Sequence, residues 1–125
     1  MTRIRPERVA HLMRREIADI LENKLDDPRL SGKVVSVTDV EVTQDLSVAR
    51  VYVSVLEAGA LRADALDALH SAAGFVRHEL APKLNLREVP EIRFIHDPSI
   101  ERGARVEELL RKIERGEAVD DSENA

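Results

Sequence analysis

Apolar residues recur at helical spacing in four stretches of the chain, which predicts four helical segments. The first helix runs from about Pro6 to about Leu25, where Asp27-Pro28 ends it. Two more segments are expected from about residue 62 to 72 and from there to about Pro82, and the last one stops at Gly116. The predicted stripes comprise Val9, Leu12, Met13, Ile17, Ile20 and Leu21; Leu66 and Leu69; Phe75, Val76 and Leu80; and Val106, Leu109, Leu110 and Ile113.

Three other stretches alternate between apolar and polar residues and predict strands. They are residues 34–43, 48–55 and 91–96, and the first two are joined by the short turn 44–47 as an antiparallel hairpin. In the first strand Val35 and Val37 are in one phase and Val40 and Val42 in the other. This slip at Thr38-Asp39 predicts a β-bulge or a strong local twist.

The element order is therefore α-β-β-α-α-β-α, which is typical of an α+β fold. We expect a three-stranded sheet with helices packed on one face and the other face exposed to water. Residues 1–115 are expected to form one domain, with Ser99 as a plausible N-cap of the last helix. The acidic residues 116–125 are expected to form a disordered tail.

Charge is distributed unevenly along the 125 residues, whose formal net charge is -5. Residues 1–15 carry five Arg and one Glu, whereas residues 116–125 carry four acidic residues and no Lys or Arg. In the first helix Arg residues gather at the N-terminal end and Asp and Glu at the C-terminal end, an order that opposes the helix dipole. An anionic partner for the Arg cluster would explain this order, and so would the low cost of surface charges.

Catalytic and metal-binding patterns are absent from the sequence. The chain has no Cys, its four His residues are scattered, and it contains neither a phosphate-binding loop nor a nucleophile elbow. Asp39 and Glu41 share a strand face, but a solvated sheet face explains them better than acid–base chemistry. We therefore expect no enzymatic activity, metal or cofactor. No apolar run approaches the roughly 20 residues of a membrane span.

The few aromatic residues bear on how the chain would bind nucleic acid. Phe75 and Phe94 fall on apolar stripes and are expected in the core, which leaves Tyr52 as the single ring available for base stacking. Phosphate contacts are then the better mechanism. The candidate donors are Arg3, Arg5, Arg8, Arg77, Lys83 and Arg87.

The small residues Ala72-Ala73-Gly74, between two predicted helices that lead into a strand, resemble a modified KH module. An ordinary KH domain has a G-x-x-G loop at this place. Because an A-x-G triplet replaces that loop here, we expect the two helices to meet at a kink.

The order of motifs over about residues 3–113 resembles the ribosome-binding factor A family. The motifs are Arg5, Arg8 and Val9; the turn 26–29; the hairpin VSVTDVEVTQDLSVARVYVS; AAGFVR from Ala72; VPEIRF from Val89; and DPSI from Asp97. The resemblance implies a type II KH fold with an additional C-terminal helix and a kink at Ala72 and Gly74, and we expect these two small residues to belong to the rRNA-binding surface. It also implies a cytoplasmic, monomeric, non-enzymatic protein that binds the free small (30S) ribosomal subunit at 16S rRNA. Its role would be to aid late maturation and processing of the rRNA 5′ end, without a membrane or a small-molecule substrate.

Two other classes of function fit the residues. One is a stand-alone KH-like protein that binds single-stranded RNA, which the missing G-x-x-G disfavours. The other is an α+β protein-interaction module with no RNA role. Salt-sensitive binding to particles that contain rRNA would separate both from the family's function.

Overall fold

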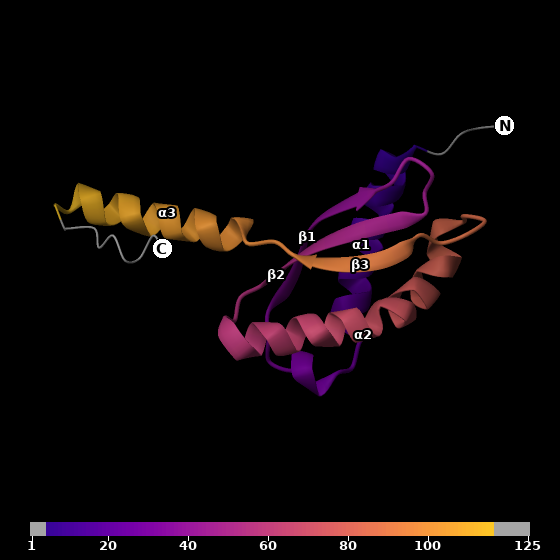
Figure 1. Cartoon of the computed structure of the whole chain (residues 1–125), viewed down its shortest axis with the longest axis horizontal. Coiled ribbons are helices and arrows are strands. Elements are labelled where there is room, and N and C mark those ends of the chain that lie inside the picture. Colours follow the sequence, from indigo (N-terminus) through magenta and orange to yellow (C-terminus); the bar gives the residue numbers. More distant parts are fainter. Residues whose placement is uncertain (1–4, 117–125) are drawn as a thin grey trace.

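The computed structural model describes residues 5–116, apart from the side chains of residues 100–102, 104 and 105. Along the chain lie helix α1 (Pro6–Asn23), the 3-10 turn η1 (Pro28–Leu30), strands β1 (Val35–Val42) and β2 (Val48–Val55), helix α2 (Gly59–Leu84), strand β3 (Glu91–His96) and helix α3 (Ser99–Glu114) (Figure 1). The predicted α+β class is confirmed. The more specific type II KH description stays a prediction. None of the described helices is long and apolar enough to cross a membrane.

The three strands form one sheet in the order β1-β2-β3, in which β1 and β2 are antiparallel and β2 and β3 are parallel. The predicted bulge is confirmed, because the register shifts between Val37 and Asp39. The extra residue restores the phase of the strand. Val35 and Val37 before the bulge and Val40 and Val42 after it all pack against the core.

Helices α1 and α2 cover one face of the sheet. Helix α1 packs on β1, α2 packs on β3, and the two helices contact each other (Figure 1). The core between these layers is aliphatic apart from one aromatic ring, and its members include Met13, Ile17, Val51, Val53, Leu69, Val76, Leu80 and Phe94. This arrangement leaves the opposite face of the sheet open, as expected.

The expectation of two helices joined at the A-x-G triplet is wrong in one respect. Helix α2 is continuous over 26 residues and contains the triplet, Pro82 and Lys83. Its axis nevertheless changes direction along its length (Figure 1). Alanine at positions 72 and 73 is a strong helix former and Gly74 adopts a helical φ, so the backbone bends without losing its helical conformation.

The last helix departs from the expected packing on the sheet. Helix α3 extends away from the two-layer body (Figure 1), and Val106, Leu110 and Ile113 of its apolar stripe are exposed. Ser99 is the first residue of this helix rather than its N-cap; the carboxylate of Asp97 accepts a hydrogen bond from the Ser99 N–H instead, at 2.9 Å. The expected end at Gly116 is confirmed, since its φ of 75° stops the helix. Of the acidic tail predicted for residues 116–125, residues 117–125 lie outside the described residues.

Candidate nucleic-acid interface

Two of the predicted phosphate donors lie at the N-terminal end of α1. Arg5 immediately precedes the helix and Arg8 lies in its first turn, and both are exposed. Arg5 lines a shallow hollow with Gln44 of the β1–β2 turn, so this end of α1 adjoins the tip of the hairpin. Arg3, the third donor predicted here, lies outside the described residues.

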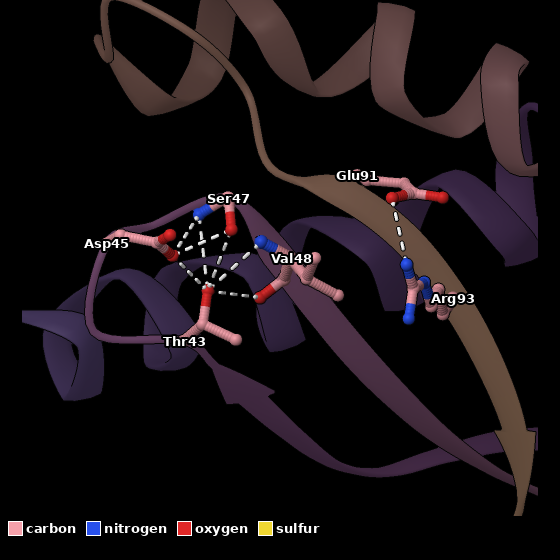
Figure 2. A network of polar contacts seen from close by, with 6 residues as sticks. All are labelled: Thr43, Asp45, Ser47, Val48, Glu91 and Arg93. Carbon is pink, nitrogen blue, oxygen red and sulfur yellow. Dashed lines mark hydrogen bonds and ion pairs between the residues drawn. The ribbon is translucent and has the colours of Figure 1, made fainter.

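The β1–β2 turn is held in one shape by a compact set of hydrogen bonds (Figure 2). The Asp45 carboxylate accepts hydrogen bonds from the Thr43 and Ser47 hydroxyls, both at 2.7 Å, and from the Ser47 N–H at 3.1 Å. These donors, led by the Ser47 hydroxyl, lower the pKa of Asp45 to about 2. The turn therefore presents a fixed backbone next to Arg5.

The α2–β3 loop brings two further donors to the same end of the molecule. The N–H of Glu91 bonds the Ser47 carbonyl at 2.8 Å, so the end of this loop lies beside the hairpin turn. Lys83 lies in the last turn of α2 and Arg87 in the loop, and both are exposed. The fold thus gathers Arg5, Arg8, Lys83 and Arg87 from two distant parts of the sequence.

Arg77 is engaged within the protein. Its Nε and Nη2 atoms donate to the Val89 carbonyl at 2.9 and 2.6 Å, which ties the exposed face of α2 to the α2–β3 loop. These two bonds use two of the five guanidinium N–H groups. Arg77 therefore positions the loop that carries Arg87, although its side chain is exposed.

The A-x-G triplet has one inward and one outward member. Ala72 is 8% exposed and belongs to the core. Gly74 is exposed, its φ is helical, and a Cβ built on it would have no atom within 4 Å. Nothing inside the protein therefore requires a glycine at position 74, although glycine costs up to about 1 kcal/mol in a helix relative to alanine.

The prediction that Phe75 belongs to the core is wrong, whereas the one for Phe94 is confirmed. Phe75 is 40% exposed and Phe94 is 4% exposed. The buried positions of this part of α2 are Ala72, Val76 and Leu80, spaced by four residues, and Phe75 lies at the edge of that stripe. The four-residue spacing of these buried positions could have predicted that Phe75 lies at the edge of the apolar stripe. An aromatic ring next to Gly74 is thus available for stacking.

The open face of the sheet carries the other candidate ring. Tyr52 donates to the Glu41 carboxylate at 3.4 Å, and partial burial followed by the charge of Glu41 raises the pKa of Tyr52. The cations nearby, Arg50 and Arg93, lie 4.0 and 3.2 Å from Glu41 and Glu91. Because each cation is balanced by a carboxylate, this face is a weaker site for phosphate than the end of the molecule that carries Arg5.

Within residues 5–116 no group of three or more His, Asp or Glu side chains could hold a metal ion. Asp39 and Glu41 do not act as a pair either. The Asp39 carboxylate accepts from the Val40 N–H at 2.9 Å, whereas Glu41 contacts Tyr52 and Arg50. The described surface offers exposed cations suited to phosphate and an exposed ring suited to stacking on a base.

Known proteins resemble this chain both in sequence and in fold. The family model of ribosome-binding factor A matches residues 5–110. The chain is 49% identical over 108 residues to a ribosome-binding factor A from Acetivibrio thermocellus, and the match covers 86% of this chain and 87% of that one. The crystal structure of ribosome-binding factor A from Thermus thermophilus superposes with a TM-score of 0.64 at 27% identity, over 73% of this chain and 93% of that one.

A third comparison concerns a structure of a complex. A homology model of the Thermus thermophilus factor, fitted into a cryo-EM map of its complex with the 30S subunit, superposes with a TM-score of 0.58. It is 30% identical to this chain, and the superposition covers 72% of this chain and 96% of that one.

Proposed function

The chain belongs to the ribosome-binding factor A family, and from that premise we propose that it binds the free 30S ribosomal subunit at 16S rRNA. A relative fitted into a map of a 30S complex supports this partner. The protein promotes late maturation of the rRNA, including processing of its 5′ end. It acts in the cytoplasm as a monomer and by binding rather than by catalysis.

The observation that carries the proposal is the exposed surface of α2 at Gly74 and Phe75. Glycine in a helix interior is costly, and here no neighbouring atom fills the space of a side chain. A partner whose backbone approaches α2 closely explains why glycine is used. The exposed Phe75 ring next to it supplies a stacking surface for a base of that partner, which contributes about 1–3 kcal/mol in comparable proteins.

The basic end of the molecule supplies the contacts to phosphate. Arg5, Arg8, Lys83 and Arg87 form charge-assisted hydrogen bonds to the rRNA backbone, and Arg77 holds the loop in place. Each phosphate neutralised releases counterions, so the affinity falls steeply as salt rises. These contacts orient the rRNA, and the surface at Gly74 and Phe75 selects where the strand approaches.

The experiment is co-sedimentation of the purified protein with immature 30S subunits, mature 30S subunits and 50S subunits at several salt concentrations. We expect the protein in the immature 30S fraction at low salt and a steep loss as salt rises. Absence from every 30S fraction at low salt would refute the proposal.

The two alternatives give different results in parallel assays. A stand-alone reader of single-stranded RNA would bind a short 16S-derived oligonucleotide as tightly as the subunit. A protein-interaction module would remain bound after the salt is raised, because apolar contacts are not weakened by screening.

A further inference from the structure

A second surface lies at the opposite end of α1 from Arg5. It is an open groove of about 730 Å³ between the C-terminal half of α1, the turn η1 and strand β1. The floor of the groove is formed by aliphatic side chains that the core leaves partly exposed, with Leu69 of α2 buried beneath them, while polar and charged residues make up much of the remaining lining. The aliphatic side chains are Leu21, Leu25, Leu30, Val35 and Val37.

One wall of the groove is a free strand edge. Within the described residues β1 pairs with β2 alone. The Leu56 N–H bonds the Val34 carbonyl at 3.0 Å, and Ser36 pairs with Ser54. Since backbone groups alternate in direction along an antiparallel strand, the N–H and C=O groups of Val35 and Val37 point to the free edge. Four hydrogen-bonding groups thus border the groove.

The edge of β1 beyond the bulge is less open to pairing. The bulge after Val37 interrupts the strand, and the Asp39 carboxylate accepts from the N–H of Val40 at 2.9 Å. Bulges and charged side chains are the usual means by which proteins prevent unwanted pairing at a sheet edge. This protection ends where the groove begins, so the open half of β1 coincides with the apolar surface.

The rim of the groove is acidic. Glu22 and Asp26 line it and form no ion pair with any of the described residues, and they lie at the negative end of the α1 dipole. The guanidinium of Arg29 is bound by Asp27 at 2.8 Å, with the charges of Asp64 and Asp67 also acting on it.

Among the described residues that line the groove Lys33 is the one cation, and it cannot balance Glu22, Asp26 and Asp27 together. The order of charges in α1 that opposes the helix dipole therefore gives this groove a negative field. Such a field repels phosphate and attracts Lys and Arg.

We propose that this groove binds an extended protein segment in which apolar residues alternate with Lys or Arg. The segment adds a strand to β1 by bonding the backbone of Val35 and Val37. Because side chains alternate across a strand, its apolar residues enter the groove on the α1 side, while its cations project from the other face of the added strand and are attracted by the field of Glu22 and Asp26 without direct contact. The site is independent of the rRNA-binding proposal and lies on a different surface.

The first test uses isotope-labelled full-length protein and a short synthetic peptide of alternating Val and Lys. The peptide is expected to shift the NMR signals of the Leu25, Val35 and Val37 amides and to slow hydrogen exchange at Val35 and Val37. A peptide of alternating Val and Glu is the control and should leave these signals unchanged.

Three results of the peptide test and its oligonucleotide control would overturn the proposal. They are unchanged signals, equal shifts with the acidic peptide, and shifts of the same amides by a single-stranded oligonucleotide. Concentration-dependent dimerisation of the protein through the same amides would also overturn it, because the occupant would then be a second copy.

Two pairs of variants test the contributions of the acidic rim and of the strand edge separately. Asp26→Lys should weaken binding of the Val–Lys peptide about fivefold. Glu107→Lys, which makes the same charge change on the exposed surface of α3, should leave it unchanged. Equal effects of the two would show that only net charge matters and would refute the site.

At the strand edge, Val35→Pro removes an N–H group that points outward and leaves the hydrogen bonds between β1 and β2 in place. Val35→Ala is its matched control. A thermal melt verifies that each variant is folded. Loss of binding with Val35→Pro and retention with Val35→Ala is the expected pattern. Equal binding by both variants would contradict strand addition.

Discussion

Replacing Gly74 by alanine should stabilise the protein and weaken its binding to the 30S subunit. Gly74 lies 15 residues after the first residue of α2 and 10 before its last, so neither helix end relaxes the cost of glycine. Its φ is helical and the added Cβ meets no atom within 4 Å. The full difference in helix propensity is therefore available, about 0.4–1 kcal/mol of unfolding free energy.

For a chain of this length, 1 kcal/mol corresponds to a rise of roughly 3–6 °C in Tm. Thermal and urea denaturation measure the gain, and co-sedimentation measures binding to immature 30S subunits. Ala63→Gly, at an exposed position of the same helix, is the matched control and should lose a similar stability without any loss of binding.

Two results would refute the reasoning about Gly74. Destabilisation by Gly74→Ala would show that position 74 is strained or crowded in solution. Unchanged binding of both Gly74→Ala and the bulkier Gly74→Val, with both proteins folded, would show that no partner approaches this part of α2.

Three further predictions follow from particular contacts. Changing Arg5 and Arg8 to alanine should leave Tm within about 1 °C, because exposed charges contribute little to stability. The same change should lower the slope of log affinity for the 30S subunit against log salt concentration by up to about one unit per lost phosphate contact. An unchanged slope would show that Arg5 and Arg8 do not contact the rRNA. The Asp45 carboxyl should titrate at about pH 2 in an NMR titration. Because its folded pKa lies below the unfolded value of 3.8, the stabilisation by its hydrogen bonds is present above pH 3.8 and lost as pH falls through about 2. A titration midpoint near 3.8 would show that the hydrogen bonds of the turn do not persist in solution. Arg77→Ala should speed amide exchange in the α2–β3 loop and cost about 1 kcal/mol, since the Val89 carbonyl loses both donors; unaltered exchange in that loop would contradict its anchoring role.

The sheet was largely predictable because its strands alternate between apolar and polar residues with a period of two, apart from one slip in the first strand. The bulge could be located from the change of phase between Val37 and Val40 alone, since a buried strand face tolerates no slip. Helix α1 was also clear from its apolar stripe, although Leu12, expected in that stripe, is 38% exposed.

Other features depend on tertiary contacts that no local pattern contains. Phe75 looked like a core residue because it is apolar, but the stripe through Ala72 and Val76 turns it toward the edge. The stripe of α3 predicted a helix correctly, and yet its three exposed apolar residues have no counterpart on the sheet.

The candidate site was likewise predictable only in part from the sequence. Individual cations such as Arg5 and Arg87 could be named from the sequence, but their common location depends on the bond between Glu91 and Ser47, which joins distant segments. The bonds of Arg77 to the Val89 carbonyl could not be foreseen for the same reason.

The central claim is that α2 contacts 16S rRNA at Gly74 and Phe75, and photo-cross-linking tests it most directly. A photoreactive phenylalanine analogue at position 75 keeps an aromatic ring where one is already exposed. The same analogue at Leu56, an exposed residue of the β2–α2 connection, is the control. On immature 30S subunits we predict a cross-link to 16S rRNA from position 75 and none from position 56. Cross-links from position 75 to ribosomal proteins alone, or equal rRNA cross-links from both positions, would contradict the account.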